Sequence, residues 1–138
     1  MNELKLVIDT SVFFSILLSR DGGIRRQILT ERQHTYYAPR FVLVELFKHK
    51  ERIAAASELQ PEALLECLHE ILARIDLMDE AGIPIGTWLE ARRLCHDVDP
   101  KDTPFVALAL HVDGRLWTGD EELKAGLRRK GFNRFFEG

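Results

Sequence analysis

The sequence predicts an α/β fold, a three-layer α/β/α sandwich whose central sheet is mainly parallel. Short apolar segments typical of strands alternate along the chain with longer segments of helical periodicity, which indicates parallel strands joined by helices. The first apolar segment contains the unbroken run LVI, which suits a strand covered on both faces. The 138 residues, 46% of them hydrophobic, suffice for a single domain, residues 1–138, with its own core.

The N-terminal part of the chain predicts one strand and two helices. Residues 4–8 form the strand, and the apolar residues 11–19 that follow predict a helix. The sequence RDGG at 20–23 predicts a turn, because glycine and aspartate favour turns, and residues 24–31 return to helix.

The middle of the chain predicts two more strands, with proline-led helices between them. Residues 35–38 and 75–78 are short β-like segments. Proline is favoured in the first turn of a helix, so we expect a long helix over residues 39–56 and another that begins at residue 61. A further helix is predicted over residues 84–96.

A polar break at residues 97–104, DVDPKDTP, precedes the C-terminal elements. Residues 105–112 are apolar on almost every side and predict a buried helix. Residues 115–118 predict a strand, and residues 121–130 predict a helix that ends at the following glycine. Residues 132–136 predict a last strand.

The composition restricts the class of protein. The net charge is −3 and the pI is about 6.0, which neither indicates nor excludes nucleic-acid binding, because a local patch can supply the field. The two cysteines, Cys67 and Cys95, are far apart, which argues against a zinc module or a disulfide framework and favours a reducing cytoplasm. We expect no signal peptide, and no apolar stretch approaches the ~20 residues that span a bilayer.

Two aspartates lie where predicted strands end. Asp9 directly follows the first strand, and Asp120 follows the LWT strand at 116–118 through one glycine. Sites in open α/β sheets form at the carboxyl ends of the strands, so both carboxylates are expected at the same edge. Each aspartate is also a good helix cap, because its side chain accepts hydrogen bonds from the free N–H groups of a helix start.

Three further acidic residues extend this pattern. Glu45 lies within the apolar FVLVELF, either in a site or on a solvent face shared with the basic residues three and four positions later. Asp102 lies just before a proline-led helix with Thr103 as the expected cap, so Asp102 is not needed as a cap. Asp99, three residues earlier, belongs either to the same site or to a solvated turn.

Carboxylates gathered at one edge repel each other. Two unit charges about 4 Å apart cost about 4 kcal/mol at an effective dielectric constant of about 20. A hard divalent cation is the simplest neutraliser, because Mg²⁺ and Mn²⁺ take oxygen ligands, and it could position and deprotonate a water that attacks a phosphodiester. Thr10 or Ser11 could then hold a water or a carboxylate beside the ion.

Four segments together resemble the acidic motifs of the PIN-domain ribonucleases. They are VIDTSVF near the N-terminus, APRFVLVEL around Glu45, DVDPKDTPFVALAL around Asp102 and LWTGDEEL near the end. Their order and spacing match from about residue 4 to residue 136. The resemblance implies a central parallel sheet in an α/β/α sandwich and a Mg²⁺- or Mn²⁺-dependent endonuclease that acts on RNA.

The resemblance also implies residue roles and partners. The positions that match the family's catalytic and metal-binding tetrad are Asp9, Glu45, Asp102 and Asp120. Ser11 matches the family's small hydroxyl beside the first aspartate, and the positions that often carry an assisting acid are Asp99 and Glu122. Members of this size resemble the VapC-type toxins of bacterial toxin–antitoxin pairs, which implies a homodimer and an antitoxin partner.

The helices predicted between residues 39 and 74 carry more apolar surface than a small sheet covers. The surplus includes Leu64, Leu65, Leu68 and Leu72. We therefore expect a second copy of the chain or an antitoxin to cover this surface.

Two other interpretations stay open. A Mg²⁺-dependent phosphoryl-transfer protein also places an aspartate at a strand end, although Ser11 stands where the haloacid-dehalogenase pattern has its second aspartate, and Val7 and Ile8 where a receiver has its acidic pair. A catalytically inert PIN-like scaffold would bind RNA or protein without cutting and would bind no divalent metal.

Overall fold

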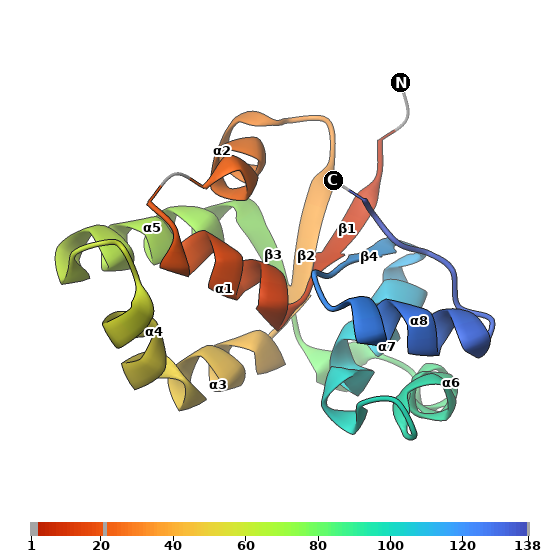
Figure 1. Ribbon diagram of the computed structural model, residues 1–138. Coiled ribbons are helices and arrows are strands. Elements are labelled where there is room, and N and C mark those ends of the chain that lie inside the picture. The colour runs from red at the N-terminus through yellow and green to blue at the C-terminus, as the bar shows by residue number, and fades with distance from the viewer. Residues whose placement is uncertain (1–2, 21, 138) are drawn as a thin grey trace.

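The computed structural model describes residues 3–20 and 22–137, and within them four parallel strands form a sheet in the order β3-β2-β1-β4 (Figure 1). The strands are β1 (Lys5–Ile8), β2 (Thr35–Pro39), β3 (Ile75–Met78) and β4 (Arg115–Trp117). The apolar run Leu6, Val7 and Ile8 is completely buried at the centre of this sheet. A central, fully covered first strand is therefore confirmed.

Helices cover both faces of the sheet, which confirms the predicted α/β/α sandwich (Figure 1). The helices that connect β1 to β3 are α1 (Thr10–Leu18), α2 (Gly23–Thr30), α3 (Phe41–Lys48), α4 (Lys50–Ala56) and α5 (Pro61–Arg74). After β3 follow η1 (Glu80–Gly82), α6 (Ile85–Cys95), η2 (Pro100–Asp102), α7 (Thr103–Val112) and α8 (Glu121–Arg129), where η denotes a 3₁₀-helix. Helix α7 packs on β1, β2 and β4. Of the buried helix predicted over residues 105–112, residues 105–109 are fully buried, Leu110 and Val112 are half-buried, and His111 is exposed.

The direction of strand addition reverses at β1. The chain adds β2 and then β3 on one side of β1, and it returns to add β4 on the other side. Such a reversal opens a crevice at the carboxyl ends of the two strands that flank it. Ile8 and Trp117 are in register there, and the backbone N–H of Asp9 donates to the carbonyl oxygen of Trp117 at 3.1 Å. The fold therefore brings the residues that follow β1 and β4 together.

The long helix predicted over residues 39–56 is wrong in two respects. Pro39 ends β2 instead of beginning a helix, because proline is tolerated at a strand end, where the chain needs no further N–H from it. His49, with φ −105° and ψ 17°, interrupts the helical backbone, so the segment forms the two helices α3 and α4.

The C-terminal strand predicted over residues 132–136 is also wrong. Phe135 forms a single bridge with Leu116, and the backbone N–H of Leu116 donates to Arg134 O at 2.9 Å. The segment lies beside β4 without extending the sheet. Of the turn predicted at residues 20–23, Asp21 lies outside the described residues and Gly23 already begins α2.

Within the described ranges, no helix is both long enough and apolar enough to cross a membrane.

Candidate functional site

Asp9 and Asp120 begin the helices that follow β1 and β4. The Oδ1 atom of Asp9 accepts a hydrogen bond from Val12 N at 3.2 Å, and Oδ1 of Asp120 accepts one from Leu123 N at 3.1 Å. Both aspartates are therefore helix caps, as one of the two interpretations of the sequence held. A carboxylate has two oxygens with about four acceptor positions, so capping leaves each side chain able to bind a further partner.

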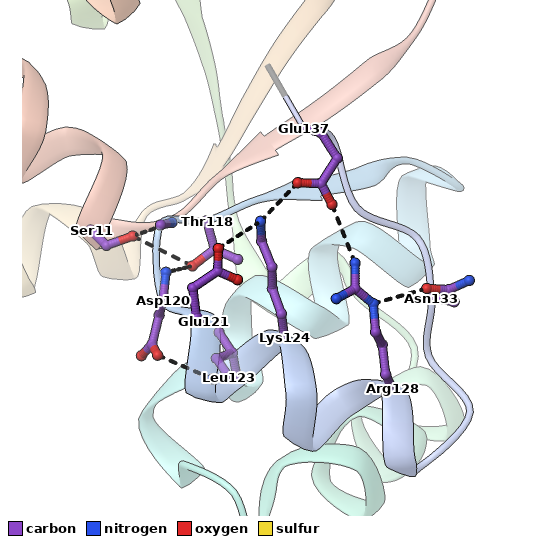
Figure 2. Close-up of polar contacts among 10 residues, drawn as sticks. Ser11, Thr118, Asp120, Glu121, Leu123, Lys124, Arg128, Asn133 and Glu137 are labelled. Atoms are coloured by element: carbon purple, nitrogen blue, oxygen red, sulfur yellow. Dashed lines mark hydrogen bonds and ion pairs between the residues drawn. The ribbon is translucent and has the colours of Figure 1, made fainter.

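A pair of hydroxyls ties these two strand ends together. Ser11 Oγ donates to Asp9 Oδ1 at 2.6 Å and accepts from Gly119 N at 2.9 Å. Thr118 Oγ1 lies 3.4 Å from Ser11 Oγ and accepts from Asp120 N at 3.1 Å (Figure 2). Ser11 was expected at the site from the sequence, whereas Thr118, which is buried with 3% of its surface exposed, was not. The available signal was a hydroxyl residue two positions before Asp120, at the end of an apolar strand.

Burial and these hydroxyls act in opposite directions on Asp9. Burial raises the pKa of the Asp9 carboxyl, and hydrogen bonds from Ser11 and Thr118 lower it, with burial the larger effect. Asp9 is 3% exposed. The structure therefore holds a carboxylate in a place where its negative charge is poorly solvated.

Glu45 joins the site from α3. Its side chain is half-buried, and Oε1 accepts a hydrogen bond from Thr10 Oγ1 at 2.8 Å. This contact places Glu45 against the start of α1, so Glu45 is not a residue of a freely solvated face. Both hydroxyls that follow Asp9 thus bind carboxylates, Thr10 that of Glu45 and Ser11 that of Asp9.

Asp102 occupies the N-cap position of α7 but makes no capping hydrogen bond. Thr103, the expected cap, is instead the first helical residue, and its Oγ1 donates to Pro100 O at 2.7 Å. The prediction of Thr103 as the cap is therefore wrong, whereas the expectation that Asp102 does not serve as a cap agrees with the structure. The half-buried Asp102 carboxylate has no local structural task.

The negative charges of the site meet at Asp102. Burial, and after it the charges of nearby carboxylates, together raise the pKa of the Asp102 carboxyl to about 7; the carboxylates, in decreasing order of effect, are Asp99, Asp9, Asp120 and Glu45. The thiol of Cys95, in the last turn of α6, also has a pKa raised to about 12, first by burial and then by the charge of Asp102. The charges of the other three residues of the predicted tetrad therefore all act on Asp102.

The supporting acids differ in their positions. Asp99 begins η2, where its Oδ1 accepts from Lys101 N at 3.1 Å, and it is the carboxylate with the largest effect on Asp102. Glu122 is exposed in the first turn of α8, and in the described part of the chain no contact joins its side chain to the others. The structure thus brings Asp99 into the cluster and leaves Glu122 at its edge.

The buried Lys124, four residues after Asp120, forms ion pairs outside the carboxylate cluster. Lys124 is buried in α8, and its Nζ lies 3.0 Å from Glu137 Oε2 and 3.8 Å from Glu121 Oε1 (Figure 2). Arg128 binds the other oxygen of Glu137 at 3.2 Å. These ion pairs hold the C-terminal segment on α8, with the Lys124 ammonium turned toward Glu137.

The donor set fits a hard divalent cation in charge and in chemistry. All donors are carboxylate or hydroxyl oxygens, and among residues 3–20 and 22–137 no ion pair joins the Asp102 carboxylate to offset its burial. Among the residues that the structure describes, no three acidic, histidine or cysteine side chains lie close enough to share an ion as they stand. A cation would therefore draw these mutually repelling side chains together on binding.

Comparison with known proteins identifies relatives at the level of family and fold. Residues 7–135 match the family described as PIN domain. No curated protein matches the chain. The chain resembles a chain in the crystal structure of VapBC2 from Rickettsia felis, which was solved bound to a DNA fragment from the VapBC2 promoter. The TM-score is 0.65, and the sequences are 16% identical over 88% of this chain and 92% of that chain.

A second solved structure, PAE2754 from Pyrobaculum aerophilum, gives a TM-score of 0.64 and 15% identity over 89% of this chain and 79% of that chain. At such low identity these two likenesses support the fold alone.

The charge of Asp102 makes the stability of the metal-free protein depend on pH. The pKa of the Asp102 carboxyl is raised to about 7, so the folded state holds the carboxyl proton more tightly than the unfolded chain does. The contribution of this group to the free energy of unfolding is therefore complete below about pH 4 and is lost as the pH rises through about 7. We predict that Asp102→Asn is more stable than wild type at pH 8 by about 2 kcal/mol, after discounting the full shift for solvent screening of a half-buried side chain. Urea unfolding in EDTA at pH 5 and pH 8 measures this; an equal pH dependence in both proteins would contradict it.

The Thr118 hydroxyl should be needed to hold the two strand ends. Thr118→Val keeps the shape of the side chain but removes the acceptor for Asp120 N, so we predict a loss of about 1–2 kcal/mol in the free energy of unfolding. Thr30→Val, at an exposed position in α2, serves as the matched control and should change the free energy of unfolding by less than about 0.5 kcal/mol. Equal stabilities of the two variants in urea unfolding would show that the hydroxyl pair is unimportant.

Proposed function

This chain belongs to the PIN-domain family, and from that premise we propose that it is a divalent-metal-dependent endoribonuclease. The observation that carries the proposal is the half-buried Asp102 carboxylate, which caps no helix and lies within the fields of Asp9, Glu45 and Asp120. A fold gains no stability from such an arrangement, since confined like charges are unfavourable. A cluster of like charges of this kind is explained if the carboxylates bind a cation.

Asp9, Glu45, Asp102 and Asp120 would hold Mg²⁺ or Mn²⁺, with Asp99 assisting beside Asp102 and Glu122 at the rim. When bound, such an ion supplies a nucleophilic water at neutral pH and charge stabilisation for the phosphate under attack. Thr10 and Ser11 orient Glu45 and Asp9 through hydrogen bonds of 2.8 and 2.6 Å. Partner residues of this kind tune how a carboxylate ligates.

RNA as the substrate and a role as the toxin of a toxin–antitoxin pair belong to the proposal. The family supports a nuclease, and the chain's resemblance in fold to VapBC2 agrees with a toxin of the VapC type. The family match leaves the phosphoryl-transfer alternative without support. One observation favours the inert scaffold: among the described residues, no three carboxylates lie close enough to share an ion. The enzyme should bind a divalent metal and the inert scaffold should not, so metal binding distinguishes the two.

We predict that the protein cuts single-stranded RNA with Mn²⁺ or Mg²⁺ and that EDTA stops the reaction. Asp9→Asn should reduce the rate at least about 100-fold, because one charge of the metal-binding set is lost. The measurement is a time course on end-labelled RNA of mixed sequence, with both proteins purified in parallel. Equal residual rates for wild type and Asp9→Asn would mean that the cutting comes from a contaminant.

A thermal melt separates the enzyme from the inert scaffold without relying on cleavage. Mn²⁺ at ten times its Kd should stabilise wild type by about 1.4 kcal/mol, a shift of a few degrees, and Asp102→Asn should lose most of that shift. His111→Asn, an exposed substitution at the far end of the same helix α7, is the matched control and should keep it. An undiminished shift in Asp102→Asn removes the ligand role of this residue.

The surplus apolar surface expected from the sequence exists in part. Of the four leucines named, Leu65 is 67% exposed, while Leu64, Leu68 and Leu72 pack partly against the core. An open groove of about 460 Å³ between α1, α3, α4 and α5 is lined by Leu17, Leu43, Leu46, Phe47, Lys50, Ile53, Ala54, Leu59, Pro61, Leu64, Leu65 and Leu68. We propose that a second copy of the chain covers this groove, with an antitoxin as the alternative occupant.

We predict that the protein is a dimer and that Phe47→Asp shifts it to the monomer mass. Phe47 is 68% exposed, so a charge there should leave the fold intact but oppose burial of the groove. Ile85→Asp, at a 76% exposed position on α6, is the control and should stay dimeric. Light scattering across a concentration series decides; a monomeric wild type at high concentration, purified without a partner, contradicts the proposal.

A further inference from the structure

A second open cavity, of about 470 Å³, lies between α6 and η2. It is lined by Trp88, Leu89, Arg92, His96, Pro100 and Thr103. Trp88, Arg92 and His96 recur every four residues, so they lie on one face of α6 and its C-terminal end. We call these three residues the α6 stripe. We propose that the α6 stripe binds a nucleotide of single-stranded RNA next to the cleavage site, an inference that rests on the proposed ribonuclease function.

The cavity lies beside the segment that carries Asp102. Pro100 and Thr103, which line it, flank Asp102 in the chain. The turn that leads from α6 into η2 is fixed by Asp99 N, which donates to Cys95 O at 2.9 Å, and by Asp102 N, which donates to Asp99 O at 3.1 Å. A strand whose phosphate lies at Asp102 must place a neighbouring nucleotide along one of the surfaces that adjoin this residue, and the cavity is such a surface.

The apolar side of the cavity suits a base. Trp88 is half-buried, and its Nε1 donates to Glu80 O at 3.3 Å, which fixes the orientation of the ring. Leu89 beside it is 62% exposed. Stacking on an aromatic ring is the sequence-tolerant way in which proteins bind the bases of single strands.

The polar side of the cavity suits a phosphate. Arg92 is exposed, and among the described residues its guanidinium makes no hydrogen bond or ion pair. The adjacent Arg93, by contrast, pairs with Glu90 at 2.5 Å and lies outside this cavity. His96, one helical turn further along, supplies a second nitrogen, and its Nδ1 lies 4.0 Å from Asp97 Oδ1. An unpaired cation beside an otherwise acidic site is what the negatively charged backbone of a substrate needs.

This combination favours RNA over a protein partner at the same surface. A protein partner would gain most from the exposed apolar residues, whereas an aromatic ring followed by an arginine and an imidazole at helical spacing matches the base and phosphate of one nucleotide. The adjoining carboxylates repel a backbone phosphate in the absence of a cation, so the stripe supplies the attraction that the cluster itself lacks.

The decisive comparison is Arg92→Ala against Arg93→Ala. Both remove one exposed arginine from α6, so they change the net charge equally, but only Arg92 lines the cavity. We expect Arg92→Ala to weaken binding of an end-labelled single-stranded RNA about fivefold in EDTA at low salt, and Arg93→Ala less than twofold. The slope of log K against log salt should fall by about 0.7 for Arg92→Ala alone, as expected for one lost phosphate contact. Fluorescence anisotropy gives both quantities.

Tryptophan fluorescence tests the stacking independently. RNA should quench the emission of wild type but not that of Trp88→Phe, because the remaining Trp117 is 6% exposed. Equal effects of the two arginine variants, equal quenching in Trp88→Phe, or no detectable RNA binding by wild type would each overturn the proposal. So would a dimer that Leu89→Asp converts to a monomer, since a second copy would then occupy the cavity.

The two levels of proposal fail in different ways. If wild type binds RNA with the expected difference between Arg92→Ala and Arg93→Ala but never cuts it, the α6 stripe stands and the nuclease function falls. If wild type cuts RNA in a metal-dependent way and the two arginine variants bind alike, the nuclease stands and the stripe falls.

Discussion

Repulsion between carboxylates at one edge of the sheet is the constraint to which the rest of this molecule is adjusted. The reversal of strand order at β1 places Asp9 and Asp120 side by side, and α3 and η2 add Glu45 and Asp102. The fold limits the cost by using two of these charges structurally. Asp9 and Asp120 cap α1 and α8, where the positive ends of the helix dipoles favour a negative charge. Asp102 stands at the start of α7 without a capping hydrogen bond, and burial followed by the neighbouring carboxylates raises the pKa of its carboxyl to about 7.

Helix capping by Asp9 and Asp120 does not exclude the ligand role that we propose for them. Asp9 uses Oδ1 for both Val12 N and Ser11 Oγ, and Asp120 uses Oδ1 for Leu123 N. Capping fixes where these two carboxylates lie, so the same hydrogen bonds stabilise the helix starts and limit how far Asp9 and Asp120 can move. The buried Thr118 hydroxyl also serves two elements, because it contacts Ser11 after β1 and Asp120 after β4.

Features with strong periodicity or a fixed topological meaning were predictable from the sequence. The unbroken run at Leu6, the buried helix at residues 105–109 and the helix that opens at Pro61 all agree with the structure, because apolar spacing and proline position carry that information locally. The approach of Asp9 and Asp120 was predictable for a similar reason, since parallel strands deliver their carboxyl ends to one edge.

Features decided by tertiary contacts were not predictable. Pro39 ends a strand because β3 pairs with β2 up to Met78, which nothing in the local sequence reveals. Residues 132–136 have the composition of a strand, but Lys124 and Arg128 hold Glu137 on α8, and the segment pairs with β4 through one bridge. The contact between Thr10 and Glu45 spans 35 residues, so its partners could be named from the sequence but not paired.

Helix α3 contributes residues both to the carboxylate cluster and to the apolar groove. Glu45 faces Thr10 at the carboxylate cluster, while Leu43 and Phe47, two residues before and after it, line the apolar groove. The helix is eight residues long, and the irregular backbone of His49 separates it from α4. If the proposed partner shifts α3 on filling the groove, it changes the affinity of the proposed site for a cation by some factor, and thermodynamic linkage requires the cation to change the affinity for that partner by the same factor. The two proposed binding events would then be coupled through a single helical segment.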